Sequence, residues 1–223
     1  MSSENAPPCV YKTPKAVKTV LLIGDSFAAQ FSQAIVDSSK ESGWNSVVWT
    51  MASCNFIIGD GGEGTPESCQ NRNDSILNWI HKNNPNVVIV SQYNRSHLPQ
   101  EELKTAILSL KQLVPSVLVI GNTPIFSDKR FMASPAIFQA TYDAPKRVSI
   151  SSTVNSDQVA SNTLLAKLEK SGIPTIDLNF LWCDSTHCNR FGRHGWLFLD
   201  PAHLSAAGAE LSIPFFENFL RSN

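Results

Sequence analysis

The stretch VLLIGDS, at residues 20–26, is the starting point for interpreting this chain. Four consecutive apolar residues end at Gly-Asp-Ser and lead into a segment with helical spacing of its apolar residues. An uninterrupted apolar run is typical of a strand that is buried on both faces of a parallel sheet. Open α/β sheets bind ligands at the carboxyl ends of such strands, which is where Ser26 stands. Asp25 and Ser26 are therefore candidates for a site, although both residue types also cap helices well.

Strand and helix patterns alternate along the rest of the chain. After a first strand at 17–24, buried runs at 47–51, 87–90, 117–120 and 175–178 predict four more strands. Helical spacing is found near 28–42, from 73 or 74 to 80, and at 99–113, 158–170 and 205–213, where Pro214 is expected to end or kink the helix. This alternation predicts an α/β fold, a three-layer α/β/α sandwich with a five-stranded parallel sheet. We expect residues 1–16 to be a linker or N-terminal extension and 17–223 to be one catalytic domain.

Composition and charge exclude several classes of function. The 223 residues carry a formal net charge of −1, which gives no electrostatic footprint for nucleic acid. No apolar run approaches the length that spans a bilayer, and the first residues show no signal peptide pattern. The Gly24 junction lacks the glycine patterns of nucleotide-binding loops, so we expect no nucleotide and no other cofactor.

The five cysteines indicate an oxidising compartment. Cys54 and Cys69 flank a glycine-rich loop, and Cys183 and Cys188 flank a short polar one, which favours two local disulfides. Four free thiols or a zinc site are the alternatives, but neither pair has the Cys-x2-Cys spacing of zinc sites, so no metal is expected. Cys9 is left over, and its partner is expected upstream of residue 1, in a longer parent protein.

Two further segments offer the groups that a serine nucleophile needs. A nucleophilic serine requires a base, and the base requires a third group that fixes its tautomer. In Asp200-Pro-Ala-His203, the carboxylate is placed to hold the imidazole, although an Asp-His pair that caps a helix is the simpler interpretation. Asn94 follows the buried run at 87–90 and could donate its amide to an oxyanion, or be an ordinary loop residue.

Taken together, these residues match a known superfamily. Gly24-Asp25-Ser26, Asn94 and Asp200-x-x-His203, in this order, resemble the SGNH (GDSL) hydrolases. The resemblance implies a flavodoxin-like fold over nearly the whole chain. It also implies Ser26 as nucleophile, His203 as general base, Asp200 as the group that orients it, and Asn94 as an oxyanion donor.

A narrower resemblance points to one branch of that superfamily. The motifs that carry it are similar to those of the periplasmic SGNH domain fused to bacterial acyltransferase-3 membrane proteins: Cys9-Val10-Tyr11, Ala52-Ser53-Cys54, Cys69 with Arg72, Asn122-Thr123-Pro124, and Cys183 with Cys188. This implies an extracytoplasmic domain, monomeric as a fragment and tethered to a membrane domain. That membrane domain of the parent chain would deliver the acyl donor. Ser53 would contribute a backbone oxyanion donor, with Gly59 as a weaker candidate.

Three functions follow from this resemblance. The first is an O-acyltransferase, in particular an O-acetyltransferase, that modifies a hydroxyl of a cell-surface glycan through a serine acyl-enzyme. The second is a carbohydrate or lipid esterase in which the same triad passes the acyl group to water. The third is a glycan-binding module without catalysis.

Overall fold

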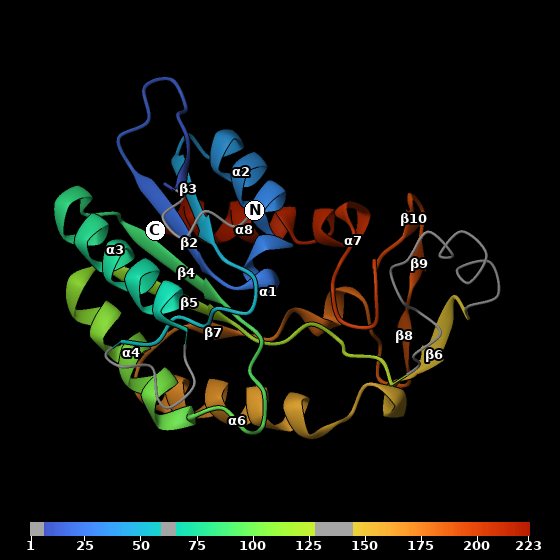
Figure 1. Ribbon diagram of the computed structural model, residues 1–223. Helices are drawn as coiled ribbons and strands as arrows, with labels where there is room; N and C mark the ends of the chain where they lie inside the picture. The colour runs from blue at the N-terminus through green and yellow to red at the C-terminus, as the bar shows by residue number, and fades with distance from the viewer. Residues whose placement is uncertain (1–6, 59–65, 128–144) are drawn as a thin grey trace.

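A six-stranded sheet runs through the centre of the computed structural model, which describes residues 7–58, 66–127 and 145–223 (Figure 1). Helices cover both faces, so the structure is the predicted α/β/α sandwich. The strand order across the sheet is β1 (Cys9–Tyr11), β3 (Asn45–Thr50), β2 (Thr19–Gly24), β4 (Val87–Ser91), β5 (Ser116–Ile120) and β7 (Thr175–Ile176).

The five strands from β3 to β7 are mutually parallel, as predicted, and β1 adds an antiparallel sixth strand at the edge. Cys9 pairs with Val48 of β3 in this ladder, so part of the segment 1–16 belongs to the sheet. The apolar pattern does not reveal β1, because all three of its residues are exposed and it joins the sheet through its backbone ladder with β3.

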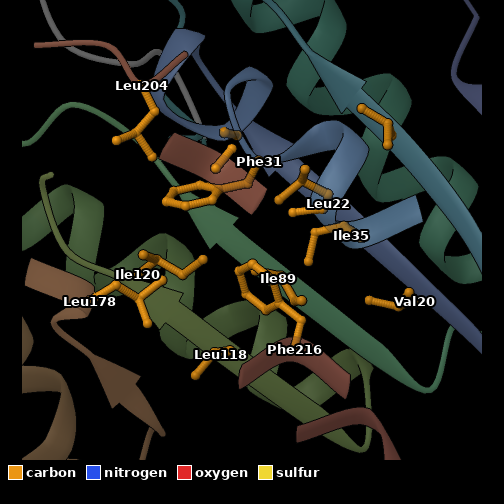
Figure 2. Close-up of a cluster of buried hydrophobic side chains, with 14 of the residues drawn as sticks. Val20, Leu22, Phe31, Ile35, Ile89, Leu118, Ile120, Leu178, Leu204 and Phe216 are labelled. Atoms are coloured by element: carbon orange, nitrogen blue, oxygen red, sulfur yellow. The ribbon is translucent and has the colours of Figure 1, made fainter. Parts of the chain in front are cut away.

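Alternating residues of the central strands pack into two cores. Val20 and Leu22 of β2 face one core, and Leu21 and Ile23 face the other. The first core is filled from α1 (Ser26–Ala29), α2 (Ser32–Glu41), α7 (Ala206–Glu210) and α8 (Ile213–Ser222), as Figure 2 shows for part of it. The second is filled from α3 (Glu67–Asn83), α4 (Gln100–Leu113) and α6 (Ser156–Lys170).

Two helices differ from their predicted limits. α3 begins at Glu67 rather than at residue 73 or 74. The prediction misses its first turns because they carry polar residues that are buried by specific bonds and form no apolar stripe. The predicted 205–213 helix is shorter, ending at Glu210, and Pro214 lies in the first turn of α8. Proline is well suited there, since the first turn needs no N–H donor from it.

The chain between β5 and α8 departs most from a simple alternation. β7 stops at Ile176 and is followed by a 3₁₀ turn, η2 (Leu178–Leu181). Two small antiparallel sheets lie beyond the main one, beside α7 (Figure 1). They pair β6 (Arg147–Ser149) with β8 (His187–Asn189) and β9 (Phe191–Gly192) with β10 (Gly195–Trp196), and a 3₁₀ turn, η1 (Ile150–Ser152), follows β6.

Both predicted disulfides are formed. Cys54 is bonded to Cys69 and Cys183 to Cys188, while Cys9 is a free, exposed cysteine. In the ranges that the structure describes, no helix is long and apolar enough to cross a membrane.

Gly24 allows the end of β2 to pass close to its neighbour. Its φ of +142° favours glycine, and a Cβ at this position would overlap the carbonyl oxygen of Ser91 on β4. We expect Gly24→Ala to lower the free energy of unfolding by about 3 kcal/mol or more, measured by denaturant titration. Gly43→Ala is the matched control, since Gly43 also has a positive φ but open space around it, and should cost only about 1 kcal/mol. Equal losses in the two variants would contradict this interpretation.

Candidate active site

The turn after β2 directs Ser26 toward the carboxyl edge of the sheet. Asp25 is the N-cap of α1, and its Oδ1 accepts a hydrogen bond of 2.8 Å from the backbone N–H of Phe27. The capping function therefore belongs to Asp25. The Oγ of Ser26 instead lies 2.8 Å from Nε2 of His203, a residue 177 positions later in the chain.

His203 is held from its other side by Asp200. The distance between His203 Nδ1 and Asp200 Oδ2 is 2.7 Å. The second carboxylate oxygen, Oδ1, accepts backbone hydrogen bonds of 2.8 Å each from Ala202 and His203, so the turn that carries the imidazole closes on this carboxylate. Because an anionic Asp200 can only accept hydrogen bonds, Nδ1 of His203 must carry the proton between them. Nε2 of His203 is then free to accept the proton of Ser26. The three predicted residues thus form one continuous hydrogen-bonded chain.

The charges of this pair support each other. The hydrogen bond that His203 donates to Asp200 raises the pKa of His203 above its usual 6.5, against the opposite effect of desolvation. Desolvation raises the pKa of Asp200, but the hydrogen bonds from His203 and from the backbone outweigh it, so this pKa lies below 3.8. The pair therefore stabilises a protonated imidazole, the form that a general base takes when it has removed a proton.

Asp25 joins the nucleophile turn to the loop after β4. Its Oδ2 accepts a 3.0 Å hydrogen bond from the backbone N–H of Tyr93. The ring of Phe27 stacks on Tyr93, with centroids 4.7 Å apart, and also contacts the ring of His203 at 5.2 Å. Burial raises the pKa of Asp25, while its backbone bonds and the nearby charges of His203 and Arg72 act in the opposite direction. The ring of Phe27 thus packs against the imidazole of His203, a contact that the sequence pattern does not reveal.

Asn94 lies in this same loop, and its backbone is firmly anchored. Its N–H donates to Oδ1 of Asn122 at 2.9 Å, and Nδ2 of Asn122 donates back to the Asn94 carbonyl at 3.1 Å. The residue is 1% exposed. Among the described contacts, no hydrogen bond links its side chain to Ser26 or His203. Its assignment as an oxyanion donor stays a prediction, in a loop whose position next to Asp25 suits it.

Ser53 follows the end of β3, which pairs with β2 so that Thr50 lies opposite Gly24. The backbone N–H of Met51 donates to the Gly24 carbonyl at 3.1 Å, and Cys54 N–H closes a turn onto Met51. Ser53 itself is exposed with φ +58°, inside this turn. Its backbone N–H thus belongs to a segment that is hydrogen-bonded, through Met51, to the residue before Asp25. The weaker candidate, Gly59, lies outside the described residues.

Three supporting residues have roles that were not predicted. Gln30 accepts the N–H of Leu204 through Oε1 at 2.8 Å, and Thr123 donates its hydroxyl to the Ala202 carbonyl at 2.9 Å, so both hold the turn around His203. The third, Arg72, donates to the carbonyl of Gly24, at the start of the nucleophile turn, and to that of Cys54, in the segment after β3. Their signal in the sequence is weak, because each acts on a partner that is distant along the chain. In the part of the chain that the structure describes, no group of three or more His, Cys, Asp or Glu could hold a metal ion.

This fold and these residues define the SGNH type of serine acyltransferases and esterases. The chain belongs to the family of SGNH domains that are fused to AT3 domains, whose model matches residues 2–218.

Solved structures share the fold at low sequence identity. The periplasmic domain of a lipopolysaccharide acetyltransferase from Salmonella ser. Paratyphi A is similar at a TM-score of 0.70 and 19% identity, with 92% of this chain and 85% of that one covered. A putative arylesterase from Agrobacterium tumefaciens has a TM-score of 0.51 and 12% identity, with coverage of 92% and 99%. An acetyl-xylooligosaccharide esterase variant from Geobacillus has a TM-score of 0.51 and 12% identity, with coverage of 92% and 94%. Comparison with curated protein sequences gave no significant match.

Proposed function

We propose that this domain is an extracytoplasmic O-acyltransferase that moves an acyl group, in particular acetyl, onto a hydroxyl of a cell-surface glycan. The observation that carries the proposal is the unbroken chain of hydrogen bonds from Asp200 through His203 to Ser26. A hydroxyl 2.8 Å from an imidazole that a carboxylate orients is the arrangement for nucleophilic acyl transfer.

The reaction has two halves. In the first, His203 Nε2 takes the proton of Ser26 as Oγ attacks the acyl carbonyl of the donor. The resulting oxyanion accepts hydrogen bonds from Asn94 Nδ2 and the backbone N–H groups of Ser53 and Ser26. Collapse of this intermediate breaks the bond to the leaving group, which receives the proton from His203, and leaves an acyl ester on Ser26.

In the second half, the glycan hydroxyl loses its proton to His203 and attacks the acyl-enzyme. The second tetrahedral intermediate uses the same oxyanion donors. Its collapse returns the proton from His203 to Ser26 Oγ and releases the acylated glycan. An esterase differs only at this step, where water takes the place of the sugar hydroxyl.

Transfer is favoured over hydrolysis by the family to which the chain belongs. Its members are fused to AT3 domains, which supports a membrane domain of the parent chain as the source of the acyl group. The two disulfides are those of an oxidising compartment, which agrees with a periplasmic or extracellular location. The similarity to an acetyltransferase domain that acts on lipopolysaccharide supports a glycan acceptor and an acetyl group.

The experiment is a competition between sugar and water. The purified domain is supplied with an activated acetyl ester and a panel of bacterial surface glycans, and mass spectrometry records acetyl gain on each sugar while released acetate is measured in parallel. We expect one class of glycan to gain acetyl in a reaction that requires Ser26.

The other outcomes assign the alternatives. Hydrolysis that no glycan of the panel intercepts would contradict the transferase and identify an esterase. A wild-type domain that turns over no ester yet binds a glycan would contradict both enzymes and identify a binding module. Ser26→Ala in the same assay measures the background of uncatalysed transfer.

A further inference from the structure

Arg72 is a buried guanidinium that lies outside the hydrogen-bonded triad. It stands on α3, is 4% exposed, and points its donors at backbone carbonyls rather than at solvent. Nη1 donates to the carbonyl of Gly24 at 2.6 Å, and Nη2 donates to the carbonyl of Cys54 at 3.0 Å. Nε and Nη2 also donate to Oδ1 of Asn73, at 3.2 and 2.7 Å, which fixes the plane of the guanidinium.

The two carbonyls belong to the two halves of the candidate site. Gly24 lies two residues before Ser26, on the turn that presents the nucleophile. Cys54 directly follows Ser53, whose backbone N–H is the expected oxyanion donor. A guanidinium is planar, and its N–H groups form a rigid fork, so bonding both carbonyls sets the spacing between them.

We propose that Arg72 is a positioning residue for acyl transfer, whose guanidinium holds the Ser53 oxyanion donor at a set distance from the Ser26 nucleophile. This rests on the proposed function, because it concerns the geometry of that same reaction. Among the described contacts, the hydrogen bonds of Arg72 go to Gly24, Cys54 and Asn73 and not to a residue of the triad. It acts through the backbone of the segments that carry the reacting groups.

Neighbouring residues on α3 support the same segment. Cys69 lies three residues before Arg72 and is bonded to Cys54, so disulfide and guanidinium act from one face of the helix on one residue. Asn73 extends this attachment, since its Nδ2 donates to the carbonyls of Asn55 and Ile57 at 3.1 and 2.9 Å. The segment 54–57 is thereby held at successive points from one helix.

The charge of Arg72 persists in this buried position. Burial lowers its pKa to about 10, opposed by the nearby charge of Asp25, so the guanidinium remains protonated at neutral pH. All of its bonding capacity toward Gly24 and Cys54 is therefore present under the conditions in which His203 acts as a base.

Arg72→Lys separates position from charge. Lysine keeps the positive charge but is a single point donor, so it cannot bond both carbonyls with the geometry of the fork. Displacement of an oxyanion donor reduces the stabilisation of the transition state more than it reduces the binding of the substrate. We expect kcat toward an activated acetyl ester to fall by about 10- to 100-fold, with KM changed by less than about 3-fold.

Two companion variants accompany this test. Asn73→Ala removes the acceptor that orients the guanidinium, together with the Nδ2 donor to Asn55 and Ile57, while the Cys54–Cys69 disulfide still holds the segment, and it should lower kcat in the same direction. It serves as the test if Arg72→Lys does not fold. Arg221→Lys is the matched control, because Arg221 bonds only to Glu217 on the surface of α8 among the described contacts, and its activity should equal that of the wild type.

Phenylboronic acid distinguishes positioning from folding. Its boron accepts an electron pair from Ser26 Oγ, whose proton passes to His203, and the tetrahedral adduct carries negative charge where the oxyanion forms. For a positioning residue, the inhibition constant should rise by a factor similar to the loss in kcat. A loss of folded protein alone lowers kcat but leaves the inhibition constant of the remaining enzyme unchanged.

The outcomes separate this proposal from the proposed function. Wild-type and Ser26→Ala domains are assayed first, and turnover that does not depend on Ser26 would overturn both. If turnover depends on Ser26, the deciding variant is Arg72→Lys. A folded Arg72→Lys domain whose kcat and inhibition constant both stay within 2-fold of the wild-type values would overturn only the role of Arg72. If that variant does not fold, Asn73→Ala is judged by the same criterion.

Discussion

Ser26→Ala is expected to lower kcat/KM toward an activated acetyl ester by about 10⁴-fold or more, because the acyl group then has no nucleophile to bond to. The oxyanion donors and the imidazole remain, so only the slower direct attack by water persists. The measurement is the rate of ester turnover by the wild-type and variant domains at equal folded concentration.

The stability of this variant should be nearly unchanged. Among the described residues, the Oγ of Ser26 hydrogen-bonds to His203 alone, and the loss of that bond costs about 1 kcal/mol in the free energy of unfolding. Asp25 rather than Ser26 caps α1, so the helix keeps its start. A Ser26→Ala domain that retains wild-type activity would contradict the assignment of the nucleophile, whereas a domain that unfolds would contradict the structural separation between Asp25 and Ser26.

Asp200→Asn is expected to have the second largest effect. The side-chain amide can donate to His203 Nδ1, which moves the imidazole proton to Nε2 and prevents Nε2 from accepting the proton of Ser26. From this change of tautomer we expect kcat/KM to fall by about 10³- to 10⁴-fold. Asp37→Asn, at a half-buried aspartate of α2 that accepts a hydrogen bond from Gln33, is the control that should leave activity unchanged.

The pH dependence of the same variant provides an independent test. In the wild type, the hydrogen bond that His203 donates to Asp200 raises the pKa of His203, so activity should rise with pH through a midpoint above 6.5. The shifted pKa values also mean that this pair stabilises the fold fully between about pH 3.8 and 6.5, and that the contribution is lost as pH increases through the folded-state pKa of His203 or decreases through that of Asp200. Asn at position 200 removes the largest cause, so the midpoint should move to lower pH. An unchanged midpoint would contradict the coupling.

Much of the fold is predictable because burial on both faces leaves a clear mark in the sequence. The apolar runs in β2, β4 and β5 are buried along nearly their whole length, and their prediction is confirmed. β1 is the counterexample, since Cys9, Val10 and Tyr11 are exposed and depend on the free edge of β3. The start of α3 is predicted too late for a related reason. Its buried residues include Arg72 and Asn73, whose burial depends on partners elsewhere in the chain.

In the candidate site, too, local contacts are predictable from the sequence, and contacts between distant positions are not predictable from local pattern alone. The Asp200-x-x-His203 spacing predicts a local contact, and the turn that closes on Asp200 shows why three residues suffice. The contact between His203 and Ser26 spans 177 positions, and at the level of sequence it follows from the resemblance to SGNH hydrolases. The roles of Gln30 and Thr123 depend on contacts of comparable range and have no local signature. The oxyanion donors remain predictions, since they act on an atom that only a substrate provides.

The acyl-enzyme itself offers the most direct test of the central claim. The wild-type domain is mixed with an activated acetyl ester, quenched in acid during steady-state turnover, digested and analysed by mass spectrometry. The triad geometry predicts one acetyl group on the peptide that contains Ser26, on Ser26 itself, and none at that position in Ser26→Ala. Acetylation of a different residue that turns over with the substrate, or rapid turnover without any acetyl on Ser26, would contradict the account.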